Sequence, residues 1–379
     1  MIDHGLSLNW DNSLAPCCVY LPGKKDTERY SYKQLDQYRA NIVNQIQTDF
    51  KKGIKHSGCD ICWKREESGE RSLRQFANEE YSHASGLVDL EFRLGSLCNL
   101  KCIMCGPHAS TQWYSELKKN IVEFKQKGHY HVKEKIDSDG RQRPDDSYYT
   151  NPWWEEEELV DFISDNISHL QKINISGGEP FKVKQFNKLF GILNQKKEKI
   201  TIQINTNGTH LDLDNVYNIL STHHSIRVVI SLEGIGSHNE YLRYPSKWQE
   251  IEKNIDYFIK MKQAIKNKDI TLSVHHTFQP ASIYSFLPLL EYCRDNDLPL
   301  ETTSVYHHAI DLTAITLEEK QQFLDKLENA DINLNRATQN IAKTIVEDII
   351  PDQRARKKYL DYIKFLDKIR NTNYSKIFI

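Results

Sequence analysis

From Val88 onward, short runs rich in β-branched residues alternate with amphipathic helical patterns, and this alternation limits the possible folds more than any other feature. Six runs have the length and composition of buried strands: 88–94, 172–176, 200–205, 227–232, 270–278 and 300–305. Apolar residues recur at helical spacing between them, as at 183–194 and 251–265. Successive strands that are joined through a helix are expected to pair in parallel, because the helix provides the long right-handed crossover that a parallel connection needs. Six units are fewer than the eight of a closed barrel, so the sequence predicts an α/β fold, a partial (β/α)6 barrel.

Three other segments depart from this pattern and indicate the domain organisation. Residues 1–85 lack the alternation, and residues 127–150 form a polar, turn-rich stretch. Residues 316–379 have a charged helical pattern that opens with a capping box at Thr316-Leu-Glu-Glu319. We therefore expect an N-terminal Cys-rich module at 1–85, a barrel at 86–315 with a polar insertion at 127–150, and a helical C-terminal cap at 316–379.

The composition is ordinary for a soluble protein and argues against several classes of partner. The 379 residues carry a net charge of −2 at pH 7, so no overall field favours nucleic acid or a membrane surface. No apolar run has the length of a membrane span, and the N-terminus lacks the features of a signal peptide. We therefore expect a cytoplasmic protein. Its eight cysteines should stay reduced there, which favours a metal or redox role over disulfides.

Three of these cysteines, Cys98, Cys102 and Cys105, follow the first predicted strand as a C-x3-C-x2-C loop. Iron–sulfur clusters are normally held by four thiolates. A loop with three cysteines either needs a fourth cysteine from elsewhere in the chain or leaves one iron of a [4Fe–4S] cluster without a protein ligand, that is, open. An open iron can chelate the amine and carboxylate of S-adenosylmethionine (SAM). The alternative is zinc, but the wide first gap and the lack of a second C-x2-C close downstream count against it.

The second predicted strand ends in Ser176-Gly-Gly-Glu-Pro180. Gly177 and Gly178 allow the backbone to approach a ligand closely, and Glu179 can accept a hydrogen bond from an ammonium group. Alone, this segment could be an ordinary strand-to-helix turn. One βα unit after a three-cysteine loop, it favours a binding role.

The segments CNLKCIMC, SGGEP, NTNG at 205–208 and SLEG at 231–234 resemble the radical SAM superfamily, over roughly Val88 to Val305. In that family an external one-electron donor, of the flavodoxin or ferredoxin type, reduces the cluster. SAM is then cleaved to a 5′-deoxyadenosyl radical, which abstracts hydrogen from a substrate. One departure is Met104, where the family usually has an aromatic residue; a polarizable Met can fill the same space against adenine.

The resemblance assigns roles residue by residue. It implies that the three loop cysteines hold the catalytic cluster and that Gly177, Gly178 and Glu179 bind the methionyl amino group. The candidates that it gives for the ribose or carboxylate of SAM are Asn205, Asn207, Ser231 and Glu233. Arg243 could neutralise the SAM carboxylate, and the alternative for this residue is a surface ion pair.

The N-terminal cysteines, in PCC at 16–18 and GCDICW at 58–63, resemble a twitch or SPASM segment, the auxiliary-cluster module of many radical SAM enzymes. The resemblance implies one auxiliary iron–sulfur cluster. Cys18, Cys59 and Cys62 are the preferred ligands, and Cys17 is less favoured because adjacent side chains rarely reach one metal together. A structural zinc is the alternative, since it accepts the same thiolates. The remaining cysteine, Cys293, is expected to be buried in the core.

The sequence thus predicts a radical SAM enzyme. A peptide or protein is the leading hypothesis for its substrate, because relatives with such modules often modify peptides. Two alternatives stay open: a methyl or aminocarboxypropyl transferase that uses SAM on the same cluster, and a non-enzymatic iron–sulfur or zinc protein. The SGGEP and SLEG segments argue against the second, since a pure metal scaffold needs no ligand-shaped strand ends.

Overall fold

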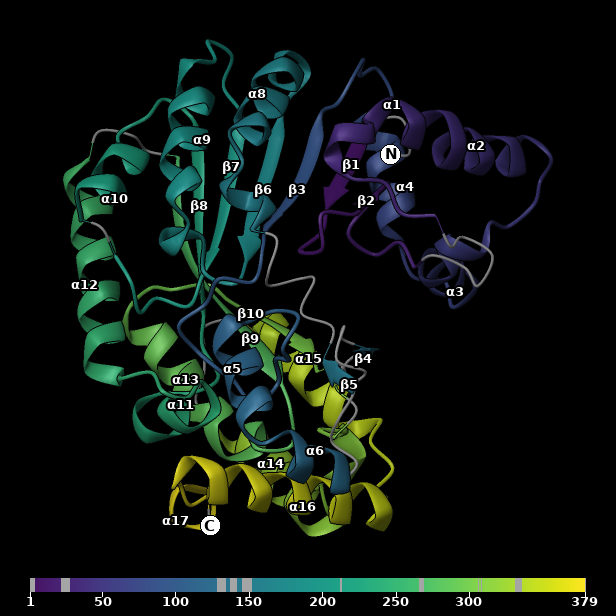
Figure 1. Cartoon of the computed structure of the whole chain (residues 1–379). Helices are drawn as coiled ribbons and strands as arrows, with labels where there is room; N and C mark the ends of the chain where they lie inside the picture. Colours follow the sequence, from purple (N-terminus) through teal and green to yellow (C-terminus); the bar gives the residue numbers. More distant parts are fainter. Residues whose placement is uncertain are drawn as a thin grey trace.

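A single sheet of eight strands organises the protein (Figure 1). The structure is a computed structural model, which describes all residues except 1–3, 22–27, 128–133, 137–141, 145–151, 212, 266–268, 306, 308, 331–335 and 379. The strand order is β10-β9-β8-β7-β6-β3-β1-β2, and β1 with β2 is the antiparallel pair in an otherwise parallel sheet. The strands are β1 (Gly5–Leu8), β2 (Leu14–Ala15), β3 (Asp89–Leu94), β6 (Lys172–Gly177), β7 (Thr201–Thr206), β8 (Ser225–Ser231), β9 (Ile270–Phe278) and β10 (Leu300–Ser304).

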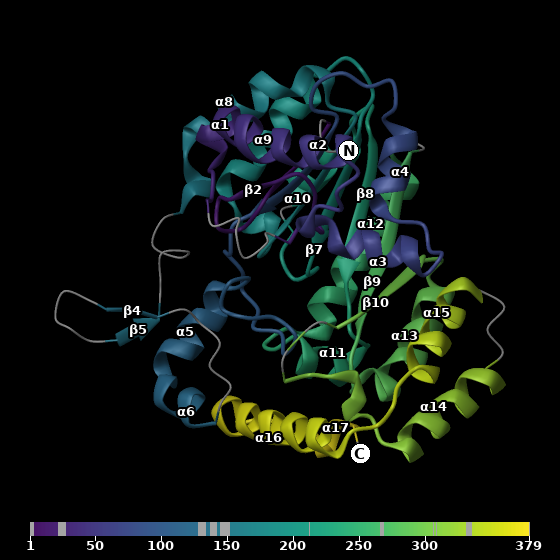
Figure 2. The ribbon, with the colours of Figure 1, turned by 90° about the vertical axis from the view of Figure 1, so that its right-hand side faces the viewer.

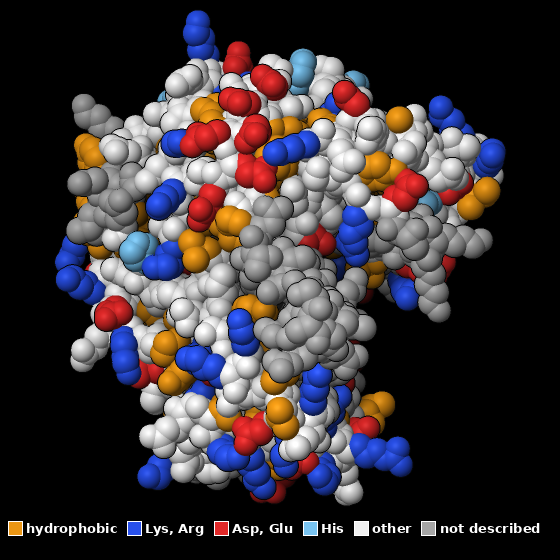
Figure 3. Space-filling view, in the orientation of Figure 1, with side chains coloured by type: hydrophobic (Ala, Val, Ile, Leu, Met, Phe, Trp, Pro, Cys, Tyr) orange, Lys and Arg blue, Asp and Glu red, His pale blue; other side chains and the backbone are white. Residues whose placement is uncertain are grey.

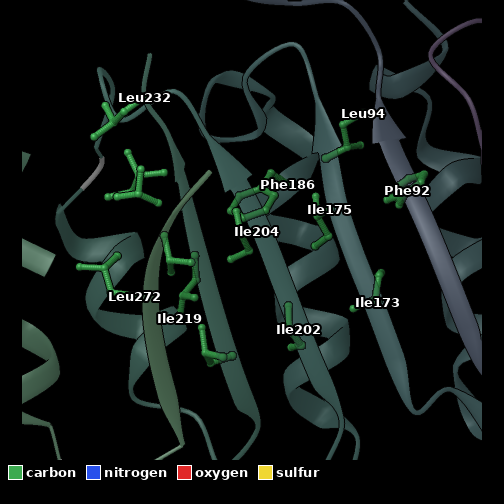
Figure 4. Close-up of a cluster of buried hydrophobic side chains, with 14 of the residues drawn as sticks. Phe92, Leu94, Ile173, Ile175, Phe186, Ile202, Ile204, Ile219, Leu232 and Leu272 are labelled. Atoms are coloured by element: carbon green, nitrogen blue, oxygen red, sulfur yellow. The ribbon is translucent and has the colours of Figure 1, made fainter. Parts of the chain in front are cut away.

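The six strands β3 and β6 to β10 confirm the predicted partial barrel, and each begins and ends within two residues of its predicted range. Alternate side chains on these strands are fully buried against helices that cover one face of the sheet (Figure 1). These helices are α8 (Glu157–Asn166), α9 (Lys184–Gln195), α10 (Leu213–Leu220), α12 (Trp248–Ala264) and α13 (Ser282–Asp295). Figure 4 shows Ile173, Ile202 and Ile204 of the sheet in this core with Phe186 of α9. Burial of each such side chain stabilises the fold by about 1.5–3 kcal/mol.

The N-terminal residues extend the same sheet, which the sequence did not predict. Strand β1 pairs in parallel with β3, with Gly5 opposite Asp89, and β2 follows at the edge. The helices of this part are α1 (Leu35–Tyr38), α2 (Asn44–Lys51), α3 (Asp60–Glu67) and α4 (Leu73–Glu80). The expected module at 1–85 therefore shares a sheet with the barrel.

A second core lies below the carboxyl ends of the strands (Figures 1 and 2). It joins α5 (Thr111–Lys119) and α6 (Ile121–Gln126) to the C-terminal helices, and Phe124 of α6 packs edge-on against Phe365 at a centroid distance of 4.6 Å. The other helices of this core are α11 (Gly236–Leu242), α16 (Gln353–Arg370) and α17 (Ser375–Phe378), whereas α14 (Leu317–Asn329) and α15 (Arg336–Glu347) pack against the first core. Charged side chains gather at this lower end of the molecule (Figure 3), where Lys357, Lys364 and Lys368 of α16 are exposed. The helical C-terminal region is thus present, and it packs beside the cysteine loop.

Short helical turns complete the described chain: 32–34, 39–43, 57–59, 153–155, 167–169, 180–182 and 312–314. Of the predicted polar insertion at 127–150, the structure describes residue 127 and a two-stranded hairpin of β4 (Glu134–Ile136) and β5 (Gln142–Pro144). The rest of that segment lies outside the described residues. In the described part of the chain, no helix combines the length and the apolar character needed to cross a membrane.

Candidate functional site

The cysteine loop leaves the carboxyl end of β3, and the first turn of α5 fixes its path. Cys98 and Cys102 are buried, and Cys105 is half-buried. Three side chains of α5 and its N-cap donate hydrogen bonds to loop carbonyl groups: Ser110 Oγ to Leu100 O, Thr111 Oγ1 to Cys98 O (3.2 Å), and Trp113 Nε1 to Cys102 O (2.6 Å). The loop has no strand or helix hydrogen bonds of its own, so these contacts satisfy its backbone and orient its thiols.

The segment that follows α11 holds the other side of the loop. The backbone N–H of Lys101 donates to Tyr244 O at 2.7 Å, and that of Ile103 donates to Leu242 O at 2.9 Å. These bonds place Arg243 beside the cysteines, and its Nη1 lies 3.9 Å from Cys102 Sγ.

The three thiols differ in their electrostatic surroundings. Burial raises the pKa of Cys98 to about 12. A hydrogen bond from Cys105 lowers the pKa of Cys102 to about 7, with help from the charges of Arg243 and Arg370. The same hydrogen bond, together with burial, raises the pKa of Cys105. Cys102 is thus the thiol that most readily becomes a thiolate, the form that binds iron.

Gly177 and Gly178 lie against the backbone that leads into the cysteine loop. A Cβ on Gly178 would stand 2.4 Å from Leu97 O, and one on Gly177 would stand 2.8 Å from Leu94 N. The backbone N–H of Gly178 donates to Gly95 O at 3.1 Å. The two glycines therefore allow β6 to approach the backbone of the same chain closely. This contact fixes the cysteine loop relative to β6.

Glu179 is fully buried, and its carboxylate accepts hydrogen bonds from the protein itself. One carboxylate oxygen accepts from Thr206 Oγ1 (2.8 Å) and from the backbone N–H of Phe181 (3.3 Å). The other oxygen accepts from the backbone N–H of Asn207 at 2.7 Å. Burial raises the pKa of Glu179 to about 7. The carboxylate thus ties the end of β6 to the end of β7.

Asn207 reaches the cysteine loop, whereas Asn205 lies on the polar face of the sheet. Asn207 Nδ2 lies 3.8 Å from Cys98 Sγ and 3.1 Å from Asn99 Oδ1. Asn205 Nδ2 instead donates to Asn174 Oδ1 at 2.7 Å. The two asparagines predicted together thus lie in different parts of the site.

Glu233 and Arg243 form a buried ion pair at the end of β8, with Ser231 half-buried at the last position of that strand. Arg243 Nη2 lies 2.7 Å from Glu233 Oε1, and the other carboxylate oxygen accepts from the backbone N–H of Thr277. Burial raises the pKa of Glu233 to about 7. The alternative of a surface ion pair for Arg243 is wrong, because this side chain is enclosed beside Cys102.

Next to this pair, the loop carries a second charged cluster that the sequence reasoning missed. Lys101 Nζ lies 2.5 Å from Glu116 Oε1, and Arg370 Nη2 lies 2.7 Å from Glu116 Oε2. Glu116 and Arg370 are both buried. The sequence offered one signal, a lysine between two loop cysteines, but nothing in it paired Arg370 with a residue 254 positions away.

The face of the sheet opposite the helices is polar, a second feature that the sequence reasoning missed. Asn205 of β7, Asn174 of β6 and Glu91 of β3 form a hydrogen-bonded row, in which Asn174 Nδ2 donates to Glu91 Oε2 at 2.7 Å. Arg227 of β8 pairs with Glu301 of β10. The signal was available, since polar residues occupy alternate positions of strands whose other positions are apolar.

The N-terminal cysteines lie close enough to one another to interact electrostatically. Burial raises the pKa of Cys17 to about 12, and the neighbouring thiols of Cys18, Cys62 and Cys59 add to this rise. Cys18 is exposed, and the charged groups acting on it are Glu91, Arg93 and Asp89 of β3. Of the two adjacent thiols, Cys17 is therefore the more enclosed.

Tyr38 lies beside this cysteine group. Its side chain is 2% exposed, and its hydroxyl has no hydrogen-bond partner within the described residues. The pKa of Tyr38 is raised by burial and then by the neighbouring Tyr20 and Cys17. A buried hydroxyl without a partner is costly, so Tyr38 has an unmet need for an acceptor.

Cys293 of α13 confirms the expected core position, at 1% exposure. Among the residues that the structure describes, no three His, Cys, Asp or Glu side chains converge on a point where one metal ion would fit. The thiolates of a cuboidal cluster bind different iron atoms and need not converge in this way.

Residues 93–277 match the family model described as Radical SAM superfamily, and they include the cysteine loop, the SGGEP segment and Arg243. The domain that carries the cysteine loop therefore belongs to the radical SAM superfamily. No curated protein sequence matches the chain significantly.

The chain is also similar to solved structures. One is anSMEcpe with bound AdoMet, at 17% identity and a TM-score of 0.42, covering 64% of this chain and 59% of that chain. The match thus spans about three fifths of the length of anSMEcpe. Another is SuiB of Streptococcus suis bound to the precursor peptide SuiA, at 16% identity and a TM-score of 0.40, covering 87% of this chain and 70% of that chain.

Proposed function

We propose that Cys98, Cys102 and Cys105 hold a [4Fe–4S] cluster that this enzyme uses together with SAM. The observation that carries the proposal is the position of three thiols on one loop, at the carboxyl edge of a parallel sheet and within the residues that match the family. Parallel α/β folds gather their chemistry at this edge. When bound and reduced, such a cluster supplies the electron that cleaves SAM to a 5′-deoxyadenosyl radical, which takes a hydrogen atom from the substrate.

The donor groups around the loop support this proposal. The thiol of Cys102 has a lowered pKa, and Asn207 and Arg243 each point a nitrogen at a cysteine sulfur. Arg243 Nε is buried and has no hydrogen-bond partner in the described part of the chain. A free donor on a buried guanidinium suits the carboxylate of SAM, since Arg binds carboxylates through several N–H groups.

We assign Glu179 a positioning role in SAM binding. Its bonds to Thr206 and to the backbone of Asn207 fix the Asn207 side chain beside Cys98. Gly177 is exposed, so the SGGEP segment still offers backbone to the methionyl group. The ribose candidates Asn205 and Ser231 remain proposals, and both lie at the carboxyl edge of their strands.

For the N-terminal group, we propose an auxiliary iron–sulfur cluster held by Cys17, Cys59 and Cys62. Its neighbour Tyr38 would then have an acceptor for its hydroxyl. We further propose an external one-electron donor of the flavodoxin or ferredoxin type. A peptide or protein remains the proposed substrate class, on the resemblance of this cysteine set to auxiliary modules of peptide-modifying enzymes.

The test is SAM cleavage by anaerobically reconstituted protein reduced with dithionite. We expect 5′-deoxyadenosine from the wild type and none from Cys98→Ala, Cys102→Ala or Cys105→Ala. Cys293→Ala is the matched control, because that thiol is buried in the core away from the loop, and it should retain cleavage. Undiminished cleavage in any loop variant would overturn the cluster assignment. Methylthioadenosine or S-adenosylhomocysteine as the sole product would favour a transferase, and an intact cluster without any SAM product would favour a non-enzymatic role.

A further inference from the structure

We propose that Arg370, on the C-terminal helix α16, positions the cysteine loop and supplies the positive charge that favours the reduced state of its cluster. The inference rests on the proposed cluster at Cys98, Cys102 and Cys105. It concerns a residue outside the part of the chain that matches the family, which ends at residue 277.

The contacts of Arg370 lead directly to the loop. Its Nε and Nη2 lie 3.1 and 2.7 Å from Glu116 Oε2, and the other oxygen of Glu116 lies 2.5 Å from Lys101 Nζ. Lys101 stands next to Cys102 in the sequence. Glu116 therefore bridges the last turn of α16 to the residue that precedes a proposed cluster ligand.

A second path runs through Trp113. The guanidinium of Arg370 lies over the indole of Trp113, 4.7 Å from the ring centroid. Trp113 Nε1 donates in turn to Cys102 O at 2.6 Å. Cation–π contacts strengthen when they are shielded from water, and this one is buried. The same side chain thus supports the loop through an ion pair and through a ring.

The cluster of charges formed by Lys101, Glu116 and Arg370 is not neutral. Two cations share one carboxylate, so one positive charge is left over beside the loop. The side chains of Arg370, Glu116 and Lys101 are 2%, 3% and 20% exposed. By contrast, Arg243 is matched by Glu233. An uncompensated buried charge is costly, and an anionic group at the loop would offset that cost.

Reduction adds one electron to an iron–sulfur cluster without making or breaking a protein bond. A nearby positive charge in a poorly screened site stabilises the more negative state. The positive charge of Arg370 acts at the loop from a buried position, because Glu116 connects it to Lys101 and Trp113 connects it to the Cys102 carbonyl. The same field should make the cluster easier to reduce.

The test is an anaerobic redox titration with dithionite, monitored by EPR. The signal to be monitored is the one that disappears when Cys98, Cys102 and Cys105 are all replaced by Ala. Arg370→Gln should shift the midpoint potential to more negative values. Arg370→Lys keeps the charge and should stay closer to the wild type. The double variant Arg370→Gln/Glu116→Gln leaves Lys101 as the surplus charge, so its potential should return towards the wild type. Arg354→Gln, on the exposed start of the same helix, is the control and should show no shift.

Each outcome decides the inference. An unshifted potential in Arg370→Gln would overturn it, and so would a double variant shifted as far as the single one, because packing rather than charge would then be responsible. If Arg370→Gln does not fold, Lys101→Gln replaces it, since it removes the other cation and should produce the same negative shift. A wild type without any EPR signal that depends on the three cysteines would instead refute the proposed function.

Discussion

Gly178 has no room for a side chain, because the carbonyl of Leu97 lies against its Cα. Replacement by Ala would place the new Cβ 2.4 Å from Leu97 O, so the cysteine loop or β6 would have to move. We expect Gly178→Ala to lower the free energy of unfolding by about 1–3 kcal/mol, as overpacking does, and to reduce the iron retained after reconstitution. Thermal unfolding and iron analysis measure the two effects.

Gly191 provides the matched control for this substitution. It lies on the exposed side of α9, with no atom within 4 Å of an added Cβ. Gly191→Ala should stabilise the protein by roughly 0.5–1 kcal/mol, because Gly is unfavourable inside helices. A Gly178→Ala protein that matches Gly191→Ala in stability and iron content would show that the contact with Leu97 is unimportant.

Glu179 and Glu233 make stability depend on pH in an unusual direction. Burial raises the pKa of each from 4.5 to about 7 in the folded protein. Their contribution to the free energy of unfolding is therefore fully present at a pH below the pKa of the unfolded chain. It is lost as the pH rises from 4.5 to about 7. We expect the apo-protein's unfolding temperature to fall over this range, and to fall less in Glu179→Gln. An equal fall in that variant and the wild type would contradict the assignment to Glu179.

At the residue scale, the sequence predicted the composition of the site better than its contacts. Cys98, Asn207 and Arg243 were all singled out from motifs, and all lie at one loop. Arg370 was missed because only tertiary packing brings α16 to Glu116. The choice between Cys17 and Cys18 stays a prediction, because the sequence does not show which of two adjacent thiols is enclosed.

Helix α5 acts as the scaffold of the cysteine loop through its N-cap, Ser110. The Ser110 hydroxyl accepts from the backbone N–H groups of Gln112 and Trp113 and donates to Leu100 O in the loop. We expect Ser110→Ala to lower the free energy of unfolding by about 1 kcal/mol, the usual cost of losing a helix cap, and to speed the loss of iron to a chelator. Chelator challenge after reconstitution measures that rate.

Ser72→Ala is the control for this helix cap. Ser72 caps α4 in the N-terminal part, where its hydroxyl accepts from the backbone N–H of Gln75. The Ser72→Ala substitution should lower the free energy of unfolding by a similar amount without changing the rate at which the cysteine loop loses iron. Equal iron loss in the two variants would mean that Ser110 acts only as a cap and does not hold the loop.

At the element scale, the long strands could be predicted and the short ones could not. The six central strands combine β-branched residues with alternating burial, so their pattern was readable. β1 has four residues and β2 has two, too few for any periodicity, and their place in the sheet depends on pairing with β3. The polar rows on the open face were readable in principle, but only once the strands were assigned to one sheet.

At the scale of the whole molecule, the N-terminal part reaches the cysteine loop as well as the sheet. The Trp10 ring lies 5.0 Å from that of His108, three residues beyond Cys105. Arg93 of β3 also donates to Cys18 O at 3.2 Å. The two cysteine groups therefore belong to one folded unit.

Metal content tests the two proposed clusters together. The wild type should bind about eight irons per chain if both sites hold [4Fe–4S] clusters, and a Cys98/Cys102/Cys105 triple Ala variant should keep about four. Cys17→Ala should lose the N-terminal iron, because Cys17 is a ligand of the proposed auxiliary cluster. Cys18→Ala should retain it, since that thiol faces Glu91 and Arg93. Iron analysis and reduced-state EPR provide the measurement.

The outcomes separate the hypotheses for the N-terminal group. Thiolates accept iron–sulfur clusters and zinc alike, so residue type alone does not choose between them. If the triple variant carries one zinc and almost no iron, the N-terminal group is a structural zinc site. The cluster at the cysteine loop would stand, but the proposed auxiliary cluster would be lost. If Cys18→Ala loses the metal and Cys17→Ala keeps it, the grouping of Cys17 with Cys59 and Cys62 is wrong, and the preference derived from the sequence would be confirmed.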